Sequence, residues 1–181
     1  MSFDRAFEKL LGVEGGYVND PRDSGGATRY GITEAVARAN GYQGVMVDLP
    51  LEWARRIYKA QYWDTLRLDD ISIIEGTIAE ELFDTSVNMG VSTAGRFLQR
   101  SLNALNRGGT DYQDLAVDGV IGPMSVSCLS RYLQHRSGAD GITVMLRALN
   151  ILQGARYIEL AESRQKDEAF LYGWLKTRVV I

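Results

Sequence analysis

The sequence contains very little cysteine, histidine and proline. Among its 181 residues there are one cysteine, one histidine and three prolines. A single cysteine excludes an internal disulfide and any metal site built from several cysteines. A zinc centre is not expected either, because such sites combine three or four ligands that are mostly cysteine or histidine. The sequence therefore predicts neither a metal nor a cofactor.

The two single residues, Cys128 and His135, could still form a nucleophile–base pair. Cys128 lies in SVSCLSRYL, a stretch with helical apolar spacing, where a small buried hydrophobic side chain is the simpler interpretation. His135 follows seven residues later, near the end of the same stretch. Seven residues span two helical turns, or about 10 Å, which is too far for proton transfer. We therefore predict a structural cysteine and a surface histidine.

The chain also lacks an excess of positive charge and long hydrophobic runs. The chain has 20 Lys and Arg residues and 23 Asp and Glu residues, which gives a net charge of −3. A general nucleic-acid binder usually carries a basic patch or stripe, so no nucleic-acid partner is expected. No apolar run approaches the roughly 20 residues of a membrane span, and MSFDRAFEKLLG does not resemble a signal peptide. We expect a soluble protein that is made in the cytoplasm and does not insert stably into membranes.

Helical patterns dominate what remains, and sustained strand alternation is rare. The spacing predicts a first helix over 2–13, capped by Ser2 and ending before two glycines, with an apolar stripe on one side. It predicts one continuous helix over 73–89, a next helix capped by Ser92 or Thr93, and a loop over 108–122 with a compact AVDGVIGPMS segment. The longest helix, which ends near Glu162, has apolar residues on much of its circumference and is expected to be buried. The tail from Glu168 is expected to dock as a helix, or alternatively to face the anionic cell envelope. The fold class is mainly α.

The stretch EGGYVNDPRDSGGATRYGIT, residues 14–33, interrupts this pattern. Its Asn-Asp-Pro, Asp-Ser-Gly and Gly-Gly steps are turn signals, so we predict an irregular hairpin or a wide loop, with two or three short strands. Thr33 is expected to cap the helix that follows. Glu14 would lie at the C-terminus of the first helix, the negative end of its dipole. That position, together with partial burial against Phe7 or Tyr17, would raise the pKa of its carboxyl. A general acid working near neutral pH needs such a shift.

Two acids in one loop suit the cleavage of a glycosidic bond. The reaction needs a proton donor for the leaving oxygen, and a negative charge or a positioned water on the other face of the sugar. Glu14 suits the first role and Asp23, across the turn, suits the second. Asp20 is the alternative, although its place before Pro21 is more typical of a turn residue. Thr28 could hold the attacking water.

Other residues have both a structural and a functional interpretation. Asn88, near a predicted helix end, is either a C-terminal cap or a polar contact to substrate. Tyr17, within the same motif as the acid, is assigned to substrate binding. An aromatic cluster is either core or a partly exposed surface on which sugar rings stack; its members are Trp53, Tyr58, Tyr62 and Trp63.

The stretch over 14–33 resembles the signature of the EGGY-type N-acetylmuramidases, glycoside hydrolase family 108, which includes phage endolysins. LFDTSVNMGVSTAGRFLQRSLN and AVDGVIGPMSVSCL resemble the predicted peptidoglycan-binding segment that accompanies this motif. The resemblance implies a lysozyme-like, two-lobed helical fold and cleavage of the bond after N-acetylmuramic acid, with Glu14 as catalytic residue. The order Glu14, Asp23, Thr28 is also similar to that of phage-type lysozymes, with the last interval one residue shorter.

These observations predict an endolysin-type muramidase that acts on bacterial peptidoglycan as a monomer. We expect a catalytic lobe over 1–78 and a helical lobe over 79–181. The enzyme would stay in the host bacterial cytoplasm until a holin opens the membrane. Two alternatives stay open: a lytic transglycosylase acting on the same bond, and a non-enzymatic module that binds the cell wall or assists secretion. Neither retention nor inversion at the anomeric carbon is predicted.

Overall fold

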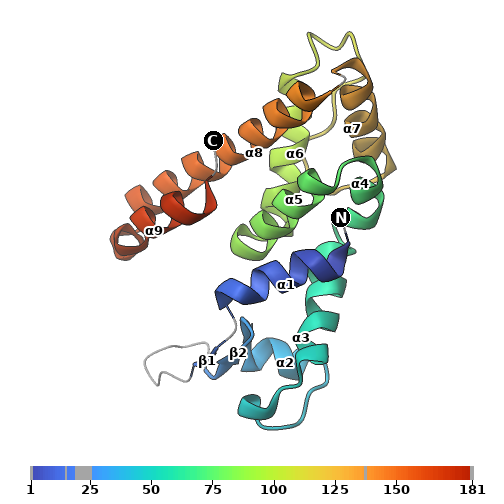
Figure 1. The fold of residues 1–181 in the computed structure, drawn as a ribbon. Helices are drawn as coiled ribbons and strands as arrows, with labels where there is room; N and C mark the ends of the chain where they lie inside the picture. The colour runs from blue at the N-terminus through green and yellow to red at the C-terminus, as the bar shows by residue number, and fades with distance from the viewer. Residues whose placement is uncertain (1, 15, 19–25, 137, 180–181) are drawn as a thin grey trace.

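The computed structural model describes residues 2–14, 16–18, 26–136 and 138–179, without the side chains of the last two residues of the first helix. The predicted mainly α, lysozyme-like fold is confirmed, with one small sheet (Figure 1). The elements up to residue 63 are α1 (Phe3–Glu14), β1 (Tyr17–Val18), β2 (Thr28–Arg29), β3 (Ile32–Thr33), α2 (Glu34–Ala39), η1 (Met46–Asp48), α3 (Leu51–Tyr58) and η2 (Lys59–Trp63). The elements that follow are α4 (Leu68–Ile74), α5 (Gly76–Met89), α6 (Val91–Ala104), α7 (Pro123–His135), α8 (Ala139–Ser163), η3 (Gln165–Asp167) and α9 (Glu168–Arg178).

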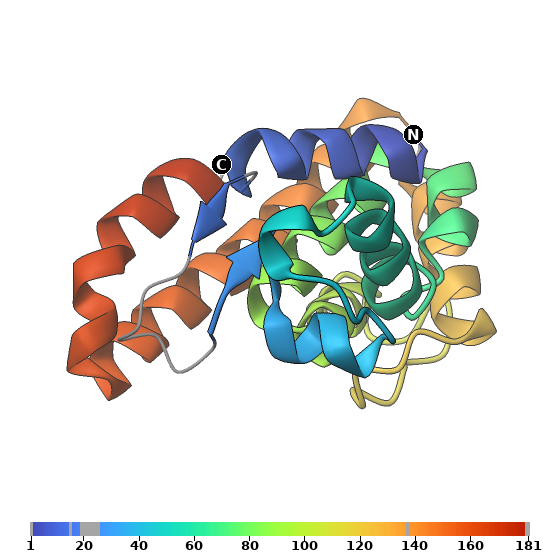
Figure 2. The same ribbon diagram turned by 90° about the horizontal axis from the view of Figure 1, so that it is seen from below.

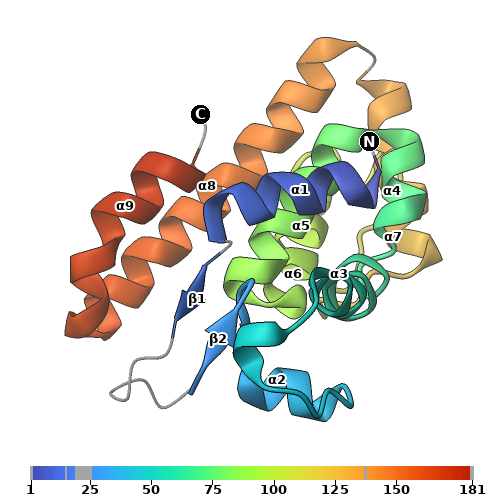
Figure 3. The same cartoon turned by 60° about the horizontal axis from the view of Figure 1, so that its bottom comes forward.

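The sheet lies below α1 and beside α2 in Figures 1 and 3. Its three strands are arranged in the order β1-β2-β3, so that neighbours in the sheet are also consecutive in the sequence. Both pairs are antiparallel, so the predicted irregular hairpin with short strands is confirmed. Thr33 ends the third strand and caps α2, since its Oγ1 accepts a hydrogen bond from the Val36 amide at 3.4 Å. Such a cap satisfies one of the free N–H groups of the first turn. The sheet is thereby joined rigidly to the helix after it.

Aromatic side chains pack α1 and η2 against α5. Phe3, Trp63 and Phe83 pack edge to face, with ring centroids 5.5 to 5.9 Å apart. Trp63 is fully buried, and its indole N–H donates to Asp69 at 2.7 Å. Such a buried N–H needs a partner. Of the predicted aromatic cluster, Trp63 and Tyr58 belong to the core and the other two members pack against it. The core interpretation of that cluster is therefore confirmed.

The prediction of one continuous helix over 73–89 is wrong, because the chain breaks at Glu75. This residue has an extended backbone, with φ −155° and ψ 112°, and separates α4 from α5. Its carboxylate accepts hydrogen bonds from the amide of Thr77 at 3.0 Å and from its hydroxyl at 2.9 Å. Glu75 thus works as an N-terminal cap, a role that acidic side chains can take at the positive end of a helix.

The junction between α5 and α6 also differs in detail from the prediction. α5 ends at Met89 as expected, and Gly90 has φ +89°, a conformation that favours glycine. The predicted cap of the next helix by Ser92 or Thr93 is wrong, because α6 already begins at Val91. A single glycine is therefore enough to turn the chain between two helices that pack on each other.

α6 packs against the loop that precedes α7 at a point where no side chain fits. A Cβ atom on Gly95 would lie 2.3 Å from the carbonyl oxygen of Gly119. Gln99, one turn further along α6, holds the same loop: its Oε1 accepts from the Gly119 amide at 2.8 Å and its Nε2 donates to Asp118 at 2.8 Å. The compact loop predicted between two helices is thus fixed to α6 by close backbone packing.

We expect Gly95→Ala to lower the free energy of unfolding by about 1–3 kcal/mol, the usual cost of forcing extra volume into a packed site. Gly12→Ala in α1 is the matched control, because a Cβ at Gly12 meets nothing within 4 Å. That variant should gain roughly 0.5–1 kcal/mol from helix propensity. Urea denaturation measures both. Equal midpoints for Gly95→Ala and the parent would contradict the close packing of α6 on the loop.

The long helix α8 is buried on one side only. Met145, Leu149 and Tyr157 face the core, whereas Ile151 and Ile158 are 56% and 44% exposed. The expectation that apolar residues bury much of its circumference is therefore wrong. α9 docks on α8 as predicted and the two run side by side in Figures 1 and 2. Among the described residues, no helix has both the length and the apolar character needed to cross a membrane.

Candidate active site

α1 carries the proposed acid to the edge of the small sheet. Phe3, Phe7 and Leu10 on its apolar stripe are buried, which confirms the predicted face. Glu14 is the last residue of the helix, so the prediction that it lies at the C-terminus is confirmed. It follows Leu10 by one helical turn. The backbone of Glu14 is therefore placed by a well-packed helix, at the negative end of its dipole.

The sheet places Tyr17 and Thr28 on adjacent strands but on opposite faces. Tyr17 pairs with Arg29, and Thr28 pairs with Val18. Directly paired residues share a face, and successive residues of a strand alternate between faces. Tyr17 is 43% exposed and Thr28 is half-buried. The two predicted substrate contacts therefore cannot line one flat surface, although both lie on the sheet that follows the acid.

The other predicted site residues differ in what can be described. Asp23, and its alternative Asp20, lie outside the described residues. Asn88 is exposed on the last turn of α5, where its amide donates to the Asp84 carbonyl at 2.9 Å and to Asp84 Oδ2 at 3.3 Å. The C-terminal cap of α5 is Gly90, not Asn88. The substrate-binding roles of Tyr17, Thr28 and Asn88 stay predictions.

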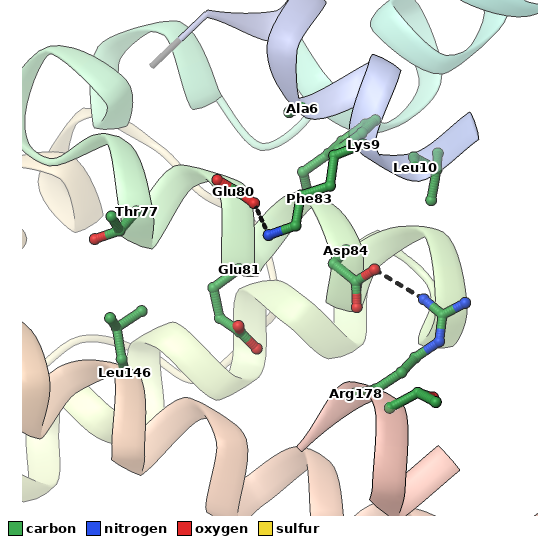
Figure 4. A pocket seen from close by; sticks show the side chains of 11 residues that line it. Ala6, Lys9, Leu10, Thr77, Glu80, Glu81, Phe83, Asp84, Leu146 and Arg178 are labelled. Atoms are coloured by element: carbon green, nitrogen blue, oxygen red, sulfur yellow. Dashed lines mark hydrogen bonds and ion pairs between the residues drawn. The ribbon is translucent and has the colours of Figure 1, made fainter. Parts of the chain in front are cut away.

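A cavity of about 350 Å³ lies where α1, α5, α8 and α9 meet (Figure 4). Leu10 lines it from α1, so it lies one helical turn before the proposed acid. Its walls combine apolar and charged side chains, namely Ala6, Lys9, Leu10, Thr77, Glu80, Glu81, Phe83, Asp84, Leu146, Thr177 and Arg178. Lys9 forms an ion pair with Glu80 across the opening, and Arg178 forms one with Asp84. The helix of the proposed acid and the two C-terminal helices therefore line the same cavity.

Glu81 and Asp84 are acids in this cavity that the sequence did not single out as site residues. With Asn88 they are spaced i, i+3 and i+7, and so share one face of α5. Burial, together with the nearby Asp84 charge, raises the pKa of Glu81 to about 7. Burial also raises the pKa of Asp84, against the opposing effect of Arg178. The one signal in the sequence is the position of charged residues on the inner side of an otherwise apolar helix, EELFD.

The interpretation of the two single residues is confirmed. Cys128 is buried, with Sγ 3.9 Å from the Gln113 carbonyl oxygen. Burial raises the pKa of its thiol, which disfavours a nucleophilic thiolate. His135 is exposed on the last turn of α7. Within the part of the chain that the structure describes, no group of three or more His, Cys, Asp or Glu residues could hold a metal ion.

The family comparisons divide the chain in two. Residues 7–90 match the family model described as Glycosyl hydrolase 108, and this range contains α1 from Phe7 onward, the sheet and the turn of Asn88. Residues 7–90 belong to the glycosyl hydrolase 108 family. Residues 93–179 match the model described as Predicted Peptidoglycan domain. The protein is therefore a glycoside hydrolase that degrades peptidoglycan. The predicted lobe boundary between 78 and 79 falls within α5, and that division stays a prediction.

A solved structure extends the likeness over both domains. The structure of Brucella abortus SagA matches 98% of this chain and 88% of that chain, with a TM-score of 0.69 and 26% sequence identity. No curated protein matches the chain in sequence. The two domains of the hydrolase thus occur together, in one arrangement, in a solved structure.

Proposed function

We propose that the hydrolase is a muramidase that cleaves the β-1,4 bond between N-acetylmuramic acid and N-acetylglucosamine, with Glu14 as the general acid. The observation that carries the proposal is the position of Glu14 as the last residue of α1, inside the glycosyl hydrolase 108 match. A carboxyl at the negative end of a helix dipole keeps its proton to higher pH than a free one. Such a group can protonate the leaving oxygen of a glycosidic bond near neutral pH.

The surrounding elements support the same assignment. The acid lies between a helix whose apolar stripe is buried, which fixes its backbone, and a three-stranded sheet whose first strand exposes Tyr17. Asp23 is proposed as the partner carboxylate, and Tyr17, Thr28 and Asn88 as contacts to the glycan. The predicted peptidoglycan domain keeps the enzyme on its polymeric substrate, which raises the local concentration of glycosidic bonds. Action as a monomer, after release from the host cytoplasm, is part of the same proposal.

Product analysis tests the bond and the type of reaction together. Purified peptidoglycan is digested to completion, and the released muropeptides are examined by mass spectrometry before and after borohydride reduction. A muramidase leaves reducing N-acetylmuramic acid ends, which borohydride converts to muramitol. Reducing N-acetylglucosamine ends would place the cleavage at the other glycosidic bond. Products ending in 1,6-anhydromuramic acid would instead assign the enzyme to the lytic transglycosylases, and release of no fragments would leave only a wall-binding module.

A further inference from the structure

One ion pair connects the two family domains through the cavity. Arg178 of α9 donates from Nη1 to Asp84 Oδ1 of α5 at 2.8 Å (Figure 4). Asp84 lies in the glycosyl hydrolase 108 match, whereas Arg178 lies in the predicted peptidoglycan domain. The two residues are 94 positions apart in the sequence. The last turn of α9 is thereby attached to the hydrolase domain.

The second oxygen of the same carboxylate holds Asn88. Asp84 Oδ2 accepts from the Asn88 amide at 3.3 Å, and that amide also donates to the Asp84 carbonyl oxygen at 2.9 Å. Arg178, Asp84 and Asn88 therefore form a continuous chain of hydrogen bonds, which we call the 178–84–88 network. It runs from the C-terminal helix to a proposed glycan contact on the last turn of α5.

α9 does not need this ion pair in order to dock. Trp174 stacks on Tyr157 of α8 with ring centroids 5.0 Å apart, and Leu175 packs against the α8 backbone beside Gly154. The side chain of Arg178 is only 13% exposed, so its charge is largely desolvated. Ion pairs of this kind add little net stability but impose a defined geometry on their partners. We therefore expect the network to orient α5 more than to stabilise the fold.

The network lies close to the end of α1. Leu10 lines the same cavity as Asp84 and Arg178, and Glu14 follows it by four residues, or about 6 Å along the helix axis. Lys9 of α1 is also tied to α5 through Glu80. A change in the orientation of the α5 turn that carries Asp84 would therefore also shift the last turns of α1.

We propose that Arg178 is a positioning residue for glycan cleavage, because it fixes the Asp84 carboxylate and through it the amide of Asn88. The predicted peptidoglycan domain then does more than bind the cell wall: its last helix completes the end of α5 in the hydrolase domain. This inference rests on the proposed function, in which Asn88 contacts the glycan and Glu14 supplies the proton.

The test measures kcat and KM on soluble, uncrosslinked peptidoglycan strands. Arg178→Met should lower kcat about tenfold, since small misplacements of substrate-positioning groups reduce turnover strongly. KM should change less than twofold. Arg178→Lys should restore most of kcat, because it retains the charge and one hydrogen bond to Asp84. Arg156→Met is the matched control, because Arg156 of the neighbouring helix α8 forms an exposed ion pair with Glu159, away from the cavity. It should keep the parent kcat.

A double-variant cycle separates positioning from general damage. Asp84→Asn should lower kcat as much as Arg178→Met, and the double variant should be no slower than either, because both remove one network. If Arg178→Met does not fold, Asp84→Asn alone carries the comparison. Three results would overturn the proposal. They are a double variant whose loss of kcat is the product of the two single losses, a parent-like kcat in folded Arg178→Met or Asp84→Asn, and a change confined to KM. If Glu14→Gln also keeps the parent rate, the proposed function itself fails; if only the network variants do, the positioning role fails alone.

Discussion

Glu14→Gln is expected to lower the rate of peptidoglycan hydrolysis by about 10²–10⁴-fold, the range that a positioned general acid contributes. Glutamine keeps the shape and length of the side chain but has no acidic proton for the leaving oxygen. Because Glu14 is the last residue of α1, the substitution should leave the buried stripe of Phe3, Phe7 and Leu10 intact. The release of reducing ends from purified peptidoglycan measures the rate.

Glu8→Gln is the matched control for this experiment. Glu8 lies on the exposed face of the same helix, so the variant removes one negative charge from α1 without reaching the end of the helix. It should keep the parent rate. Thermal unfolding checks that both variants are folded at the assay temperature. A Glu14→Gln enzyme that works within a few-fold of the parent would show that another group donates the proton.

The sequence predicted best where short-range signals decide the structure. The apolar stripe of α1, the short strands of the hairpin and the Thr33 cap each depend on signals within a few residues, and all three are confirmed. The position of Glu14 at a helix end follows from the same local signals. Local chemistry therefore placed the backbone of the proposed acid, while the partner carboxylate Asp23 lies outside the described residues.

The sequence predicted poorly where distant segments decide. The break at Glu75 depends on a cap that competes with an otherwise continuous helical pattern. The exposure of Ile151 depends on which side of α8 meets the core, and a helix with apolar residues all round gives no hint of that side. The cavity of Glu81 and Asp84 exists only because α1, α8 and α9 close over α5. Contacts between residues this far apart cannot be read from periodicity.

Glu81 has an environment that its sequence position does not suggest. Its Oε1 is buried and has no hydrogen-bond partner among the described residues. Burial, and to a smaller extent the Asp84 charge, raise the pKa of its carboxyl to about 7. The Asn150 side chain and the Lys9 charge oppose it, and Glu80 again favours the protonated form. In the folded protein Glu81 thus stays protonated at pH values where the unfolded chain has already lost that proton.

This difference makes stability depend on pH in a defined direction. In the unfolded chain Glu81 ionises near 4.5, and in the folded protein only near 7. Between these values the folded state binds more protons, so its free energy of unfolding falls as pH rises from about 4.5 to about 7 and is level above. The penalty at pH 8 is on the order of 3 kcal/mol. Glu81→Gln, which cannot ionise, should therefore be more stable than the parent at pH 8 and show little difference at pH 4.

Urea denaturation at pH 4, 6 and 8 measures this prediction, with Glu80→Gln as the matched control. Glu80 precedes Glu81 on α5 but pairs with the exposed Lys9 at the mouth of the cavity. Losing that surface pair should cost less than about 1 kcal/mol. A Glu81→Gln variant whose stability runs parallel to that of the parent at all three pH values would show that the carboxyl is solvated. The cavity would then be open to water at Glu81. That water would weaken the Arg178–Asp84 ion pair of the 178–84–88 network by screening its charges.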